Sequence, residues 1–88
     1  MILSRSLYKK LGNYLAKQRV KSGLSQIEVA KLSSGITPQF ISNIERGAAA
    51  VPMHLLVKWA EIYEINHTIL IKFILRNIEE QLKKDLAQ

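Results

Sequence analysis

Four polar side chains recur at helical spacing in the middle of this 88-residue sequence: Gln39, Ser42, Asn43 and Arg46. Residues three and four positions apart share one face of a helix, so two amides, a hydroxyl and a guanidinium would lie side by side. Amide and guanidinium groups read base edges in the DNA major groove, and guanidinium and hydroxyl groups hold phosphates. The face is therefore typical of a DNA-recognition helix, although an ordinary solvated surface helix has the same polar character.

A short helix would position these side chains, and its start and stop are encoded beside them. The Thr37 hydroxyl can cap the first turn, and Pro38 suits the first helical position because no amide hydrogen is needed there. Gly47 can adopt the left-handed conformation that ends a helix. Two isoleucines three positions apart form an apolar stripe opposite the polar face. The sequence therefore predicts an amphipathic helix over residues 37–46.

The composition indicates a single folded domain spanning residues 1–88. Apolar residues make up 48% of the chain, which is enough for one modest core. There is no cysteine, and so neither a disulfide framework nor a thiolate metal site is expected. The N-terminus lacks the apolar run of a signal peptide, and the apolar stretch 65–75 is too short to span a bilayer. We therefore expect a soluble, cytoplasmic protein.

The excess of positive over negative charge lies entirely in the first half of the chain. Residues 1–47 hold eight Lys and Arg side chains against two Glu, whereas residues 48–88 hold five basic and five acidic residues. The whole net charge of +6 therefore belongs to the half with the polar helix face. A one-sided positive field attracts polyanions such as DNA, with an anionic membrane surface or a general solubility charge as the alternatives.

A first helix is predicted over residues 4–22, where apolar residues recur at helical spacing and Ser4 or Ser6 would cap it. Gly12 lies inside that range, and a glycine in a helix interior costs about 1 kcal/mol relative to alanine. A helix that begins near Gly12 is therefore the alternative.

Three further helices follow from caps and apolar periodicity. Ser25-Gln26-Ile27-Glu28 is a capping box that opens a second helix, ending near Ser33. Pro52 starts a fourth helix, and Asn66 caps a fifth that runs to about Leu86. No stretch alternates like a half-buried strand. The predicted fold is all-α with five helices, the second and third forming a helix-turn-helix unit.

Residues with a shared pattern run through the centre of the chain: Leu11-Gly12, Arg19, Gly23-Leu24-Ser25-Gln26, Val29-Ala30, Ile41-Ser42-Asn43-Ile44-Glu45-Arg46-Gly47, Pro52, Leu56 and Trp59-Ala60. In this order and spacing they resemble the phage repressor/Cro family of helix-turn-helix domains, also called the xenobiotic-response-element family. The resemblance covers residues 12–66. It implies a lambda-repressor-like domain with a core at 11–66 and an extended C-terminal helix at 67–86.

The resemblance also implies roles for individual residues. Gln39 and Asn43 match base-reading positions, and Pro38 occupies a position that often carries another base reader. Arg19 and Glu45 match an ion pair that bridges the first and third helices. The expected phosphate contacts are Gln26, Lys31, Ser34, Thr37, Ser42 and Arg46.

The turn between the two central helices departs from the family pattern. The stretch from Gln26 to Glu45 is one residue longer than the commonest family spacing, and the extra residue falls within Lys31–Gly35. This insertion is expected to shift Ser33 and Ser34 toward the DNA backbone. Phe40 either touches a thymine methyl group or packs against a neighbouring helix, and we favour packing.

The sequence offers little for catalysis or metal binding. His54 and His67 are the only histidines, and neither has a second ligand at metal-binding spacing. There is no nucleophile motif and no glycine-rich phosphate loop. We expect no enzyme activity, no metal and no cofactor.

The fifth helix suggests a partner, because it is apolar on most sides at its start. A helix of this kind needs more than one surface to bury against. We expect a homodimer, in which the interface residues are Ile71, Ile74, Leu75, Ile78 and Leu82. The alternative is that the whole helix folds back along the first helix and covers Leu7 and Leu11.

The predicted function is a sequence-specific transcriptional regulator that inserts helix 37–46 into the major groove of double-stranded DNA. The alternative is an antitoxin-type or other protein-interaction module that binds a partner protein through its C-terminal helix. A peripheral membrane role is disfavoured, because residues 67–88 hold four basic and three acidic side chains, too small an excess for an electrostatic anchor.

Overall fold

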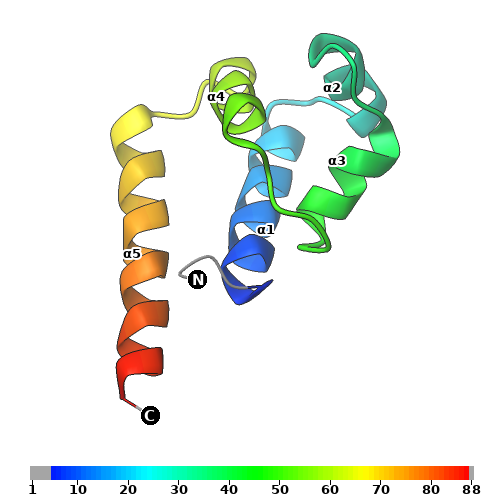
Figure 1. Cartoon of the computed structure of the whole chain (residues 1–88). Helices are drawn as coiled ribbons and strands as arrows, with labels where there is room; N and C mark the ends of the chain where they lie inside the picture. The colour runs from blue at the N-terminus through cyan, green and yellow to red at the C-terminus, as the bar shows by residue number, and fades with distance from the viewer. Residues whose placement is uncertain (1–4, 88) are drawn as a thin grey trace.

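The computed structural model describes residues 5–87, in which five helices are joined by short connections (Figure 1). They are α1 (Arg5–Lys21), α2 (Gln26–Leu32), α3 (Pro38–Glu45), α4 (Met53–Ile62) and α5 (His67–Leu86). No strand occurs within this range, and the prediction of an all-α, five-helix fold is confirmed. Figure 1 places α2 and α3 on one side of α1 and α5 on the other.

Local side-chain caps set the starts of three helices. The Ser25 hydroxyl accepts from the Glu28 amide at 3.0 Å, and the Glu28 carboxylate accepts from the Ser25 amide at 2.9 Å. The latter bond lowers the pKa of the Glu28 carboxyl below its usual value. The Thr37 hydroxyl caps α3, and the Asn66 side chain caps α5. Each cap satisfies an amide that the helix itself leaves unpaired.

The start of α4 differs from the prediction by one residue, whereas the start of α1 agrees with the predicted helix over residues 4–22 rather than with its alternative. Pro52 is the N-cap of α4 rather than its first helical residue, so that helix begins at Met53. α1 begins at Arg5 and not near Gly12, and it continues through Gly12 without interruption. Ser6 lies inside α1, and Ser4 lies outside the described residues.

Gly12 lies where α1 crosses α3. A side-chain carbon added at Gly12 would collide with the backbone carbonyl of Ile44. The absence of a side chain therefore lets the two helices approach closely, and this contact outweighs the low helix propensity of glycine.

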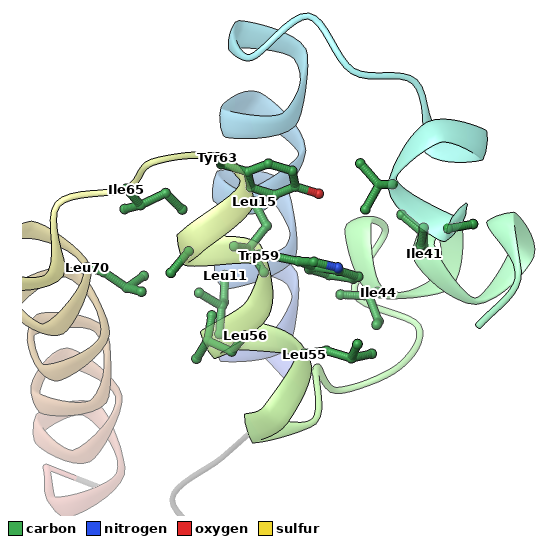
Figure 2. Packing of buried hydrophobic residues seen from close by; sticks show 13 residues of the cluster. Leu11, Leu15, Ile41, Ile44, Leu55, Leu56, Trp59, Tyr63, Ile65 and Leu70 are labelled. Carbon is green, nitrogen blue, oxygen red and sulfur yellow. The ribbon is translucent and has the colours of Figure 1, made fainter. Parts of the chain in front are cut away.

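The core is built around Trp59 of α4 (Figure 2). The fully buried side chains are Leu15, Val29, Ile41, Ile44 and Trp59. They come from α1, α2, α3 and α4, so the core joins the first four helices. Burial of such side chains contributes about 1.5–3 kcal/mol each, and this packing fixes which face of α3 points outward.

One side of α5 packs along α1. Leu70 is buried, and the ring of Phe73 stacks on the ring of Tyr14 with centroids 4.4 Å apart. Ile74 also packs against the core, and Lys10 approaches Glu80 at 4.0 Å. Within the described residues, no helix is long and apolar enough to cross a membrane.

Candidate nucleic-acid interface

The outward face of α3 is a continuous row of polar side chains. The Gln39 amide nitrogen donates to the Asn43 side-chain oxygen at 3.0 Å, and the Arg46 guanidinium donates to the same oxygen. Arg46 also donates to the Ser42 hydroxyl at 3.4 Å. Because the Asn43 oxygen already accepts twice, the groups left to meet a ligand include the Asn43 amide N–H groups, the Gln39 carbonyl oxygen and second N–H, and the remaining N–H groups of Arg46. Such donors and acceptors match those on base edges.

The opposite face of α3 is fully apolar and buried. Ile41 and Ile44 are 0% and 1% exposed. Phe40 is half-buried and packs against the core, as expected. This burial holds the helix in one rotational position, and the polar row is therefore presented to solvent.

The N-terminal end of α3 is shaped by Thr37 and Pro38, which are both exposed. Pro38 occupies the first helical position and offers no side-chain donor or acceptor. The Thr37 hydroxyl accepts from the Phe40 amide at 3.1 Å and keeps its own hydrogen for a further acceptor.

Glu45 joins three helices at the inner edge of this surface. Its carboxylate accepts from Arg19 of α1 at 2.7 and 3.2 Å and from the Gln26 amide of α2 at 2.8 Å. Arg19 also donates to the Leu24 carbonyl at 2.8 Å. The hydrogen bond to Glu45 raises the pKa of the Arg19 guanidinium, against the effect of desolvation. The network ties α3 to α1 and α2.

The turn between α2 and α3 differs in part from the expectation. Ser33 is 3% exposed, and its hydroxyl accepts from the Trp59 indole nitrogen at 2.9 Å. The expectation that Ser33 faces a phosphate is therefore wrong, because its side chain lies in the core and its hydroxyl is bonded to the Trp59 indole. Lys31 and Ser34 are exposed at the same end of the unit, where the turn reverses through Gly35 at φ +86.

Further basic and polar groups lie beside the C-terminal end of α3. Ser6, Lys9, Lys10 and Asn13 of α1 line a shallow hollow together with Glu45 and Arg46. Gly47 makes this possible, because an added side-chain carbon would lie only 2.6 Å from the Lys9 Cα atom. Sequence reasoning did not single out Lys9 or Asn13, and the only signal was the concentration of positive charge in residues 1–47.

Groups suited to metal chemistry do not come together in this part of the molecule. His54 and His67 are exposed on different helices. Within residues 5–87, no three His, Cys, Asp or Glu side chains lie close enough to hold one metal ion.

Comparison with known proteins supports the interpretation of this surface. A family model described as helix-turn-helix matches residues 15–70, which extend from α1 to the first turn of α5. No curated protein and no solved structure matches the chain. The match covers more than half of the sequence and includes the whole α2–turn–α3 unit. The chain therefore belongs to the Cro/C1-type helix-turn-helix family, a family of DNA-binding transcription regulators.

Proposed function

We propose that this protein binds an operator sequence by inserting α3 into the DNA major groove. The observation that carries the proposal is the two-sided character of α3. Its polar row is exposed as one hydrogen-bonded surface, while Ile41 and Ile44 are completely buried on the other side. A short helix presented in this way fits a groove about 12 Å wide.

The residues of the surface divide into base readers and phosphate holders. Gln39 and Asn43 are proposed to read base edges, whereas Pro38 shapes the helix start without a hydrogen bond of its own. The proposed phosphate contacts are Gln26, Lys31, Ser34, Thr37, Ser42 and Arg46, with Lys9 added by its position beside Arg46. Gln26 is already bonded to Glu45, and only its carbonyl oxygen and second N–H remain for a ligand.

The test is selection of bound sequences from a random pool of duplex DNA. An enriched motif supports sequence-specific binding, and an inverted repeat in that motif supports a symmetric dimer on the DNA. A pool that shows no enrichment after several rounds would contradict operator recognition.

Substitutions in α3 then distinguish residues that contact base edges from residues that contact phosphates. Gln39→Ala or Asn43→Ala is expected to cost about 1–3 kcal/mol of binding on the selected site and to relax the base preference there. The matched control is Lys31→Ala, which removes an exposed charge outside α3 and should weaken selected and random DNA by the same factor. The assignment of readers fails if Gln39→Ala also lowers both affinities equally.

The protein is further proposed to act as a cytoplasmic homodimer. One helix-turn-helix unit contacts few base pairs, and two copies would read half-sites about one helical turn apart. The supporting observation is the apolar exposure of α5, where Ile71 and Leu75 are 55% and 59% exposed. The same exposure supports the second candidate function, an antitoxin-type module that binds a different protein through α5. Sedimentation equilibrium of the purified chain distinguishes a self-associating protein from one that waits for another partner.

A further inference from the structure

α5 has a second apolar stripe on the side that does not pack against α1. Its members are Ile71, Leu75, Ile78 and Leu82. Ile71, Leu75 and Leu82 are 55%, 59% and 43% exposed, whereas Ile78 is half-buried. The stripe is separate from the inner side of α5, where Leu70, Phe73 and Ile74 pack against the core.

The spacing of this stripe is that of a two-stranded coiled coil. Its members are separated by four, three and four positions, which is the alternation of apolar residues along a coiled-coil seam. The stripe covers residues 71–82 of the 20-residue helix α5, which is somewhat under two heptads of apolar seam. A seam of this kind is completed by another helix of matching pattern, and a second copy of α5 supplies one.

The charged residues beside the stripe select the direction of pairing. Lys72 and Glu79 are exposed on its solvent flank, each directly after a stripe residue in sequence. In an antiparallel pair, Ile71 faces Leu82 of the second copy and Leu75 faces Ile78. Lys72 of each copy then lies opposite Glu79 of the other, so the two-fold symmetry generates two oppositely charged pairs.

A parallel pair offers no such complementarity. Residues on this flank would then face the other flank of the neighbouring helix, which places Lys72 beside His67 and Glu79 beside Ile74. Both contacts lack an opposite charge, and Ile74 is already packed against its own chain.

We propose that two copies of this chain associate through antiparallel pairing of α5, with the Ile71–Leu82 stripe as the seam and Lys72–Glu79 pairs at its edge. The proposal rests on the proposed homodimer and specifies its surface, direction and register. It also leaves Ile74 out of the seam, although that residue was expected at the interface.

Charge reversal tests the direction of pairing. In Lys72→Glu, both edge pairs become Glu against Glu, and in Glu79→Lys both become Lys against Lys. Each variant alone should dimerise about tenfold more weakly than wild type in low-salt sedimentation equilibrium. An equimolar mixture of the two variants should recover wild-type affinity, because every edge pair in the mixed dimer has opposite charges.

The matched control for charge reversal is Lys84→Glu. It makes the same charge change on the same helix, at an exposed position away from the stripe. Its dimerisation should stay within twofold of wild type. Circular dichroism of all variants verifies that the helix content is unchanged.

Disulfide trapping tests the register independently, since the chain has no cysteine of its own. Under mild oxidation, a mixture of Ile71→Cys and Leu82→Cys should form the mixed disulfide, and neither variant should couple to itself. Two copies of position 71 lie about 16 Å apart in the antiparallel register, too far for a disulfide. Parallel pairing would give the reverse pattern, with self-coupling only.

Three results overturn the inference: a wild-type chain that is monomeric at tens of micromolar, charge variants that associate as tightly as wild type, or self-coupling in the disulfide test. Operator binding is tested separately, by selection of bound sequences from the random DNA pool. A monomer that still enriches a motif refutes only the α5 seam, and a dimer that enriches none refutes only operator recognition.

Discussion

At the scale of single residues, the position of α3 depends on the largely buried carboxylate of Glu45. The side chains of Arg19 and Glu45 are only 14% and 8% exposed, and their 2.7 Å contact is completed by Gln26. A buried charge is tolerated because its partner and its hydrogen bonds are present together. The pair therefore holds α3 in position, and in the proposed function it acts on DNA recognition only through that position.

Removal of Arg19 should be strongly destabilising. Arg19→Met leaves the Glu45 carboxylate without its cation, at an expected cost of about 3 kcal/mol in the free energy of unfolding. Urea denaturation measures the loss, with Lys17→Met as the control on an exposed site of the same helix. The double variant Arg19→Met/Glu45→Leu should recover much of the stability. An Arg19→Met protein as stable as wild type would refute the role of this pair.

The buried phenol of Tyr63 should make the free energy of unfolding depend on pH in the alkaline range. Its hydroxyl is buried and has no hydrogen-bond partner among the described residues, and burial raises the pKa of its phenol, with a further contribution from the negative charge of Glu45. The folded state therefore retains this proton more strongly than the unfolded state, whose tyrosines titrate near about pH 10. The resulting stability is fully present below about pH 10 and is lost as the pH rises toward the folded-state pKa.

The corresponding variant is Tyr63→Phe. At neutral pH it should be as stable as wild type or slightly more stable, because an unpaired buried hydroxyl is removed. Above about pH 10 its free energy of unfolding should fall less steeply than that of wild type. Some slope will remain, because burial also raises the pKa of Tyr14. Superimposable pH profiles of wild type and variant would contradict this account.

At the scale of helices, the crossing of α1 and α3 decides the position of the candidate interface. Gly12 lets α1 approach the backbone of α3 at Ile44, and Gly47 lets the following turn approach Lys9. Bulk at either position would move α3 relative to the core. The crossing also brings Lys9 and Arg46 to the rim of one hollow.

Gly12→Ala distinguishes between two effects, because helix propensity and packing predict changes of opposite sign in the free energy of unfolding. Helix propensity alone predicts a gain of about 1 kcal/mol. The collision with the Ile44 carbonyl predicts a loss of about 1–3 kcal/mol, as in other overpacked interiors. We expect the loss, measured by thermal or urea unfolding, with a shift in the amide NMR signals of α3. A more stable Gly12→Ala protein would mean that α1 and α3 do not cross as described.

At the scale of the whole molecule, the opposite sides of α1 carry different surfaces. α3 lies on one side and α5 on the other (Figure 1). The half of the chain that contains α3 holds the entire net charge of +6, while the half that contains α5 is neutral. The proposed DNA binding and the proposed self-association therefore involve different parts of the fold, and each can be tested without the other.

The segregated charge predicts a steep salt dependence of DNA binding. The logarithm of the binding constant should fall with the logarithm of salt concentration, with a slope of about −0.9 for each phosphate neutralised. Fluorescence anisotropy should show Lys31→Ala reducing the slope by about 1, while Lys58→Ala in the neutral half leaves it unchanged. An affinity independent of salt would argue against phosphate contacts by the basic half.

The features that the sequence determined by itself are those that act within one or two helical turns. Thr37, Pro38 and Gly47 set the ends of α3, and the Ser25–Glu28 capping box sets the start of α2, because a cap bonds only to its nearest amides. The polar row from Gln39 to Arg46 follows from helical periodicity alone. These local rules were sufficient for the fold class and for the centre of the candidate interface.

The tertiary structure decided what depends on distant partners. The Ser33 side chain points into the core, where its hydroxyl accepts a hydrogen bond from the Trp59 indole. The length of the turn in the sequence does not predict this bond. Gly12 is accommodated inside α1 because a side chain there would collide with α3. Lys9 lies beside Arg46 only because the two helices cross at this point. α5 is apolar on most sides, so its sequence cannot distinguish the side that α1 covers from the side that stays exposed. The packing of α5 on α1 decides between these sides, because Phe73 stacks on Tyr14 and is half-buried, whereas Ile71 is 55% exposed.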